Sequence, residues 1–374
     1  MRKLISLILA VLLAVMPVGA AEYEAKSWIL MDAATGTVLD SGSEHERLAP
    51  ASVTKVMTLL LIMEAIDSGA ISWEDTVTAS ASAAAKGGSQ VYLKEGETMT
   101  VRDMLKSVAV SSANDCACAM AEHIAGSEAA FVERMNARAK ELGMEHTHFV
   151  NCTGLDDGPE AAEHRTSARD IALMSRELLT KHPAIREFTT IWMDTIRGGA
   201  FGLSNTNKLI RFYKGATGLK TGFTASAMYC LSASAEREGM ELIAVVMGAP
   251  TSAARFATCK ELLDYGFAGW TVYAPELPEE TAVPVRLGKA PSVRAVADPA
   301  PILVEKAKKA ALRTETELAE ELPAPIAQGQ PLGTLRIYAG EELLAERPLT
   351  AESAVERRTW SDIFLELLKK TAFG

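Results

Sequence analysis

Alternating and periodic patterns of apolar residues divide most of the chain into strand-like and helix-like segments. Residues 27–41 place WILMD and TVLDS on either side of Ala-Ala-Thr-Gly, which predicts a β-hairpin. Residues 228–249 place MYCLSASA and ELIAVVMGA around Glu-Arg-Glu-Gly-Met and predict a second hairpin. Residues 101–125, 128–142 and 166–180 carry apolar side chains at helical spacing. Strands from both ends and helices from the middle predict an α+β fold, an antiparallel sheet covered by helices.

The pattern of apolar residues and prolines changes after residue 267. Prolines punctuate short alternating runs such as AVPVRL, PILVEKA and GTLRIYA, and this pattern predicts a small all-β domain. We therefore assign residues 22–270 to the α+β domain and residues 271–354 to the β-domain.

The N-terminal residues 1–21 have the three-part pattern of a secretory signal peptide. Arg2 and Lys3 precede an apolar run, and Val18-Gly19-Ala20 supplies the small residues of a cleavage site. A retained membrane anchor is the alternative, but the apolar run is shorter than a membrane span and ends in Pro17 and Gly19. We expect the chain to be exported to the outer face of the cytoplasmic membrane.

The C-terminal residues 355–374 are predicted to form an amphipathic helix. Its apolar residues fall at i, i+3, i+4, i+7 and i+8, and they are Trp360, Ile363, Phe364, Leu367 and Leu368. Basic residues lie on either side of this apolar stretch. Such a helix could dock onto its own protein, but at the end of an exported chain it suits a bilayer interface. We expect residues 356–374 to hold the chain peripherally on a membrane surface.

Composition and charge narrow the classes of function. The chain has 374 residues, of which 48% are hydrophobic and 23% charged, and its formal net charge is −10. Removing Arg2 and Lys3 with the signal peptide makes the charge −12, a surface that disfavours nucleic acid. The five cysteines are odd in number and form no CxxC pair, so we expect buried free thiols. The histidines and cysteines show no metal-ligand spacing, and we expect neither a metal nor another cofactor.

A candidate nucleophile lies where a loop leads into an apolar helix, in the segment Ser52-Val53-Thr54-Lys55. Residues three apart lie on one face of a helix, so Lys55 would lie beside the Ser52 hydroxyl. The helix N-terminus would favour an alkoxide there. The spacing alone leaves two interpretations open: a nucleophile with its base, or a helix cap followed by a solvated lysine.

Two further short motifs favour the interpretation of Ser52 and Lys55 as a nucleophile and its base. Ser112-Ala113-Asn114 is a polar interruption before an Ala-rich helix, and Lys220-Thr221-Gly222 lies at the start of the second predicted hairpin. Alone, the first could be a helix cap and the second a turn. Ser-x-x-Lys, Ser-x-Asn and Lys-Thr-Gly, in this order in an exported chain, form the set found in penicillin-binding proteins and serine β-lactamases.

The sequence resembles the low-molecular-mass penicillin-binding proteins that act as serine D-alanyl-D-alanine carboxypeptidases. The likeness covers essentially the whole chain and includes APASVTKVMT, GSQVYLKEGETMTVRDML, SSANDCACAMAEHIAG, HRTSARDIALMSREL and GLKTGFT. It also includes the C-terminal β-domain and the terminal helix, which resemble that family's membrane-proximal module and anchor. The sequence departs mildly from this family at two positions. Cys152 stands where many members have a proline, and Phe223 follows Lys-Thr-Gly where some members have a histidine.

The resemblance implies a role for each motif residue. Ser52 would attack the penultimate D-alanine carbonyl of a peptidoglycan stem peptide, with Lys55 as the base. The charge of Lys220 would help to lower the pKa of Lys55. The remaining candidates would relay the proton (Ser112), hold the substrate amide (Asn114), form the oxyanion hole (backbone N–H of Ser52 and Phe223) and bind substrate beside it (Thr221, Gly222, Arg255). Thr221 and Arg255 would bind the terminal carboxylate. β-Lactam antibiotics would acylate the same serine.

The motifs exclude one related enzyme activity but not another. A class A β-lactamase needs a glutamate-activated water, and no Glu-x-x-Leu-Asn follows Ser112. A D,D-endopeptidase that cleaves peptidoglycan cross-links would use the same residues, so the motifs do not exclude it.

Overall fold

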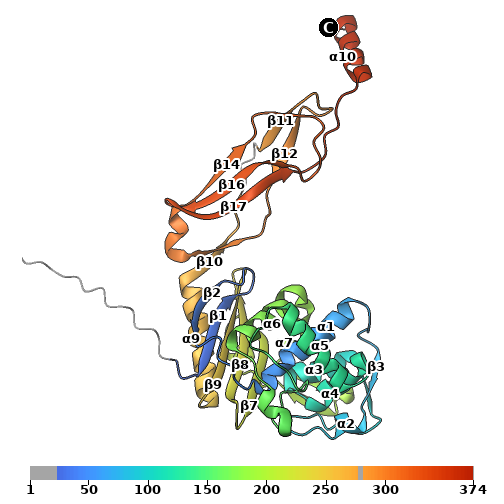
Figure 1. Ribbon diagram of the computed structural model, residues 1–374, viewed down its shortest axis with the longest axis vertical. Helices are drawn as coiled ribbons and strands as arrows, with labels where there is room; N and C mark the ends of the chain where they lie inside the picture. The colour runs from blue at the N-terminus through green and yellow to red at the C-terminus, as the bar shows by residue number, and fades with distance from the viewer. Residues whose placement is uncertain (1–22, 277–280, 374) are drawn as a thin grey trace, which may run out of the picture.

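The computed structural model describes residues 23–276 and 281–373 (Figure 1). The predicted signal peptide lies outside these residues. The first domain is built on a five-stranded antiparallel sheet in the order β2-β1-β9-β8-β7. Its strands are β1 (Ser27–Asp32), β2 (Val38–Gly42), β7 (Ala216–Thr224), β8 (Met228–Arg237) and β9 (Met240–Ala249). Both predicted hairpins are present, and β1 from the N-terminal end pairs with β9.

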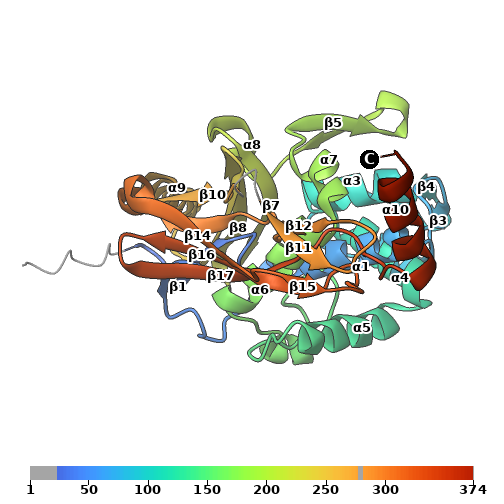
Figure 2. The ribbon, with the colours of Figure 1, turned by 90° about the horizontal axis from the view of Figure 1, so that it is seen from above.

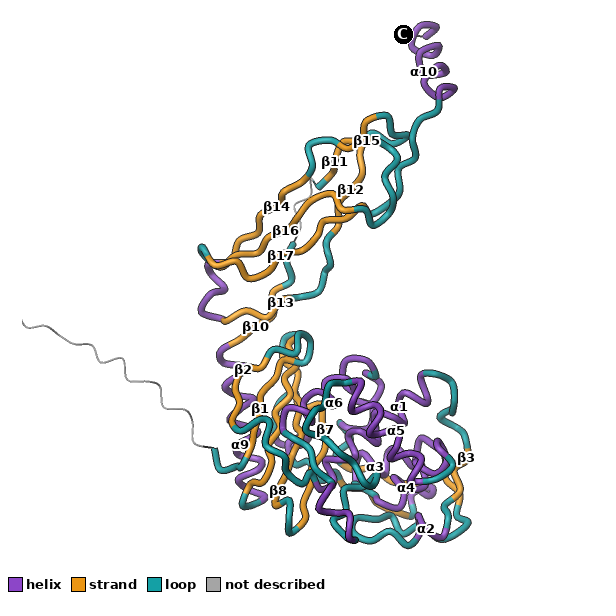
Figure 3. Tube along the Cα trace, viewed as in Figure 1, coloured by secondary structure: helices purple, strands orange, loops and turns teal. Residues whose placement is uncertain are grey.

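Helices cover both faces of this sheet because its central strands are apolar on both faces. Along β9, Leu242, Ala244 and Val246 belong to one buried cluster together with residues of α9 (Ser252–Gly269). Ile243, Val245 and Met247 point to the opposite face and belong to the cluster formed with the other helices. Figure 3 shows most of the helices on that second side of the sheet.

The helices of the second face are packed around α1 (Lys55–Asp67), which is apolar nearly all round and buried. Its main neighbours are α3 (Val101–Ser111), α4 (Asn114–Ala125), α5 (Glu128–Glu141) and α6 (Ala168–Lys181). The predicted helix over 101–125 is two helices, because Ser112 adopts φ 63° and ψ 28° and so ends α3. This break places the Ser-x-Asn motif at a turn between two buried helices.

Shorter elements complete the first domain. The short helices are η1 (Ala51–Thr54), α2 (Ala81–Ala84), η2 (Pro159–Glu163), η3 (Pro183–Ile185), α7 (Arg186–Thr189), η4 (Arg197–Gly199) and α8 (Leu209–Phe212). Two small two-stranded antiparallel sheets pair β3 (Thr76–Thr78) with β4 (Thr98–Thr100), and β5 (Met193–Ile196) with β6 (Phe201–Ser204).

The second domain is all-β, as predicted. Six strands are ordered β14-β16-β17-β12-β11-β15, and β10 pairs with β13 in a separate ribbon. Their bounds are β10 (Trp270–Tyr273), β11 (Ala282–Arg286), β12 (Ser292–Val296), β13 (Ile302–Glu305), β14 (Leu312–Leu318), β15 (Leu322–Pro323), β16 (Pro331–Ala339) and β17 (Glu342–Ala351), with η5 (Lys306–Ala311) between β13 and β14. Lys306 Nζ donates to the Phe267 carbonyl of α9 at 2.6 Å and so joins the two domains. In Figure 2, which looks from the side of the β-domain, the six-stranded sheet lies in front of the first domain.

The chain ends in α10 (Trp360–Phe373), at the end of the β-domain farthest from the first domain (Figure 1). Trp360 is 88% exposed and Phe364 62%, and Leu367 and Leu368 are exposed as well, so these four side chains do not pack onto the rest of the protein. No helix among residues 23–276 and 281–373 is both long enough and apolar enough to cross a membrane.

Candidate active site

Ser52 and Lys55 lie side by side at the start of α1. Ser52 is in η1, one turn before the helix, and the Lys55 ammonium donates to Ser52 Oγ at 3.0 Å. Lys55 also donates to the Thr153 carbonyl at 2.8 Å. Ser52 is partly exposed, whereas Lys55 has an exposed fraction of 0%. The interpretation of Lys55 as a solvated lysine is therefore wrong, and Ser52 makes no side-chain capping bond.

Burial changes the acid–base chemistry of this lysine. It lowers the pKa of Lys55 from 10.5 to about 7, because a buried ammonium loses its hydration. Cys152 and Asp115 oppose this change only in part. At neutral pH a large fraction of Lys55 is thus an uncharged amine, 3.0 Å from a hydroxyl, and can accept its proton.

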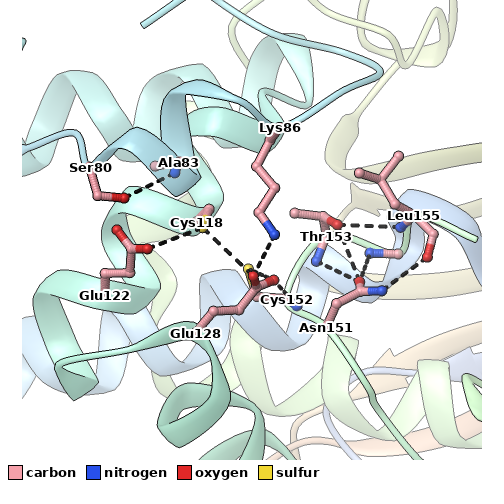
Figure 4. Close-up of polar contacts among 11 residues, drawn as sticks. Ser80, Ala83, Lys86, Cys118, Glu122, Glu128, Asn151, Cys152, Thr153 and Leu155 are labelled. Carbon is pink, nitrogen blue, oxygen red and sulfur yellow. Dashed lines mark hydrogen bonds and ion pairs between the residues drawn. The ribbon is translucent and has the colours of Figure 1, made fainter. Parts of the chain in front are cut away.

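The carbonyl that accepts from Lys55 is held by a compact loop (Figure 4). Asn151 Oδ1 accepts from the backbone N–H of Thr153 at 3.1 Å and of Gly154 at 2.7 Å. Its Nδ2 donates to the Leu155 carbonyl at 2.9 Å. The Asn151 side chain therefore fixes the backbone that positions Lys55.

A cluster of thiols lies behind the same loop. Cys152 Sγ donates to Glu128 Oε1 at 3.2 Å, and Cys118 Sγ approaches Glu128 Oε2 at 3.8 Å. Lys86 forms an ion pair with this carboxylate at 2.5 Å (Figure 4). All five cysteines are free and buried, which agrees with the prediction. In the described part of the chain, no group of His, Cys, Asp or Glu side chains is placed to hold a metal ion.

Ser112 and Asn114 present polar atoms that lack partners. Ser112 Oγ and Asn114 Oδ1 are buried without a hydrogen-bond partner among residues 23–276 and 281–373. The Asn114 amide nitrogen donates to the Gly87 carbonyl at 2.7 Å, which fixes the direction of the side chain. Neither side chain caps α4, whose first turn has no side-chain capping bond. Because buried polar groups normally have partners, these two atoms are suited to a ligand.

Lys220 and Thr221 lie on β7, one of the two edge strands of the sheet. The fully buried Lys220 ammonium donates to the Thr221 carbonyl at 2.9 Å. Burial lowers its pKa well below the usual value, and the charges of Lys55 and Arg255 add to this effect. Burial is the main cause of the lowered pKa of Lys55, and the expectation that the charge of Lys220 adds to it stays a prediction.

A glycine allows β7 to approach the nucleophile. A Cβ atom at Gly222 would lie 2.6 Å from the Pro50 carbonyl oxygen and 3.1 Å from the Ser52 nitrogen. A side chain would force β7 away from Ser52, which explains the need for glycine in Lys-Thr-Gly.

Thr206, which no motif indicated, connects β7 to the end of α3. Thr221 Oγ1 donates to Thr206 Oγ1 at 2.7 Å, and the Thr206 N–H donates to the Val110 carbonyl at 3.2 Å. Val110 is two residues before Ser112, so this bridge holds the Ser-x-Asn turn against β7.

Phe223 lies near the end of β7, and the side chain of Arg255 reaches the same part of the strand from α9. The Arg255 guanidinium is 7% exposed and donates to the Gly222 carbonyl at 3.0 Å and to the Cys230 carbonyl at 3.2 Å. Phe223 is 54% exposed and packs against Tyr229, with 4.4 Å between the ring centroids. The structure thus brings a buried cation next to the carbonyl of the motif glycine.

Comparisons with known proteins agree with this arrangement. A family model described as D-alanyl-D-alanine carboxypeptidase matches residues 14–251, and one described as the C-terminal domain of penicillin-binding protein 5 matches residues 277–357. The chain is 43% identical to the D-alanyl-D-alanine carboxypeptidase DacF of Bacillus subtilis over 93% of this chain and 89% of that protein.

Among solved structures, one matches over most of this chain and another over about two thirds of it. Penicillin-binding protein 5 from Haemophilus influenzae matches with a TM-score of 0.76 and 31% identity over 92% of this chain and all of that one. Penicillin-binding protein D2 from Listeria monocytogenes, in an ampicillin-bound form, matches with a TM-score of 0.61 and 31% identity over 66% of this chain and 99% of that one. From the motif geometry and these matches together, the chain belongs to the D-alanyl-D-alanine carboxypeptidase family of serine peptidases.

Proposed function

We propose that Ser52 is the nucleophile with which this carboxypeptidase removes the terminal D-alanine from peptidoglycan stem pentapeptides. The observation that carries this proposal is the buried Lys55 amine, 3.0 Å from Ser52 Oγ. Ser52 Oγ forms a bond to the penultimate carbonyl carbon while its proton passes to Lys55. The C–N bond then breaks, and Ser112 relays a proton to the leaving amine. Water hydrolyses the resulting ester and restores Ser52.

The remaining motif residues bind the substrate in this proposal. The N–H groups of Ser52 and Phe223 stabilise the tetrahedral oxyanion, and Asn114 holds the substrate amide. Lys220, Thr221 and Arg255 supply donors for the terminal carboxylate. Entry of that carboxylate would raise the pKa of Lys220, whose charge is otherwise disfavoured by burial.

β-Lactams fit the same site as covalent inhibitors, and the likeness to an ampicillin-bound Listeria protein supports this. Labelled penicillin should mark one serine per chain, on the peptide that carries Ser52. Ser52→Ala should abolish both labelling and D-alanine release. Lys55→Ala should label poorly, because the Ser52 hydroxyl then has no base to activate it. Labelling that maps to Ser112 would overturn the assignment.

D,D-endopeptidase activity is the second candidate, because the same site could accept a longer leaving group. Mass analysis of products from a D-Ala-D-Ala pentapeptide and from a cross-linked dimer separates the two activities.

We further propose that the chain is exported and held on the membrane surface, with segments 1–21, 22–270, 271–354 and 355–374 as signal, catalytic domain, β-domain and anchor. The exposed apolar side chains of α10 and the basic residues in its sequence support a peripheral attachment. Deleting residues 356–374 should release the mature protein from anionic vesicles. Equal sedimentation of the truncated and mature proteins would refute the anchor.

A further inference from the structure

Behind Ser52, a chain of buried hydrogen bonds joins His164 to the backbone of η1. The Val150 N–H donates to His164 Nδ1 at 3.1 Å, and His164 Nε2 lies 2.7 Å from Thr54 Oγ1. The Thr54 hydroxyl donates to the Ala51 carbonyl at 2.8 Å. Thr54 has an exposed fraction of 0% and His164 of 3%.

The direction of each bond in this chain follows from the first. Because Nδ1 accepts from a backbone N–H, the neutral ring carries its proton on Nε2 and donates it to Thr54. Burial, with the charges of His148, Arg165 and Lys55, lowers the pKa of His164 to about 4. The ring therefore stays neutral at neutral pH, and it is not suited to proton transfer at Ser52.

The chain ends on the peptide unit that contains the Ser52 N–H. The Ala51 carbonyl and the Ser52 N–H belong to one planar trans peptide, so fixing the oxygen also fixes the direction of the N–H. Ala51 adopts φ 49°, a left-handed conformation that surrounding contacts must hold. A Cβ atom at Gly154 would clash with the Ala51 carbonyl, so the loop backbone packs closely on the same peptide.

We propose that His164 and Thr54 are positioning residues that orient the Ser52 N–H as an oxyanion-hole donor. This inference rests on the proposed role of Ser52. The bond to the Ala51 oxygen also polarises the peptide and strengthens its N–H as a donor. The oriented Ser52 N–H stabilises the transition state more than the bound substrate, because the carbonyl oxygen of the substrate gains its negative charge only in the transition state.

The test compares Thr54→Val, which keeps the shape but removes the hydroxyl, with Thr54→Ser, which keeps it. Thr54→Val should lower the rate constant of acylation by penicillin about ten- to a hundredfold, less than the ~10²–10³-fold loss expected when a donor is removed outright. Noncovalent binding of penicillin should stay nearly unchanged, and the pH at which acylation is half-maximal should not move. Thr54→Ser should restore most of the rate. A peptidyl boronic acid, which forms a tetrahedral adduct, should lose affinity by a similar factor.

His164→Gln provides the second variant and keeps an amide N–H near the position of Nε2. It should retain more activity than His164→Phe, with melting temperatures recorded for each. The matched control is His182→Gln: His182 is also buried but pairs with Asp67 at the opposite end of α1, so acylation should be unaffected.

The outcomes separate the two proposals. Full-rate acylation in both Thr54→Val and His164→Phe, with Ser52→Ala unlabelled, would overturn the positioning role and leave the nucleophile intact. Labelling of Ser52→Ala would overturn the proposed function itself. A loss in Thr54→Val that appears only as weaker noncovalent binding would also contradict the inference. If Thr54→Val does not fold, the comparison of His164→Phe with His164→Gln decides: a slow His164→Phe beside a faster His164→Gln supports the positioning role, and equal rates at the level of the His182→Gln control overturn it.

Discussion

The low pKa of Lys55 predicts the pH dependence of acylation. An ordinary lysine with a pKa of 10.5 is neutral in only about one molecule in 3,000 at pH 7. With a pKa of about 7, roughly half of Lys55 is neutral there, so burial increases the competent population about a thousandfold. The acylation rate should rise about tenfold per pH unit below pH 7 and level off above it.

The assay is the second-order rate of labelling by penicillin between pH 5 and pH 9, with the melting temperature recorded at each pH. His164 titrates at about 4 and does not interfere in this window. Because the folded pKa of Lys55 is depressed, the unfolded chain binds the additional proton between pH 7 and 10.5. The lysine therefore destabilises the fold progressively as the pH falls through that range and adds no further change below pH 7.

Lys55→Arg is the matched variant, because a guanidinium keeps the charge but cannot act as a base. It should not label at any pH in this range. A rate that is independent of pH between 5 and 9, or that still rises tenfold per pH unit up to pH 9, would refute a base with a pKa of about 7.

Three further predictions concern packing and charge. Gly222→Ala should reduce acylation by at least about tenfold, measured by penicillin labelling, because the new methyl group would lie 2.6 Å from the Pro50 oxygen. Normal labelling would show that β7 can move without loss. Arg255→Ala should cost roughly ten- to a hundredfold on peptides with a free terminal carboxylate, because a charge-assisted bond is lost. An ester substrate without that carboxylate should lose less, and equal losses would contradict the assignment. The five buried cysteines should not react with Ellman's reagent in the native protein, and all five should react after denaturation. Fewer than five thiols in the denatured chain would contradict the free-cysteine description.

Local patterns predicted most of the fold. Period-two alternation gave the hairpins around Gly36 and Gly239, and helical spacing gave α5 and α6 within about two residues. The break at Ser112 was the main error in helix bounds, because a left-handed serine between two apolar helices has no reliable local signal. The sequence also did not show that Lys-Thr-Gly belongs to a strand, because these three residues alone are typical of a turn. Only their pairing with β8 in the tertiary structure makes them part of β7.

The candidate site was predictable only where residues are close in sequence or belong to a known motif set. Ser52 and Lys55 are three apart, so helical geometry alone brought them together. The supports for the site come from distant segments: Thr153 binds Lys55 across 98 positions and His164 binds Thr54 across 110. The buried histidine could have been noticed only as an isolated polar residue, because its partners depend on the tertiary fold.

The elongated arrangement of the two domains has a consequence for which substrates the enzyme reaches. If α10 lies flat in the bilayer interface, the β-domain acts as a spacer that holds the first domain at a set height above the lipid surface (Figure 1). Short soluble peptides would be processed equally well with or without this spacer. Stem peptides fixed within the wall would be trimmed only in the layer that the site can reach, so the length of the β-domain selects a zone of the wall rather than a chemical structure.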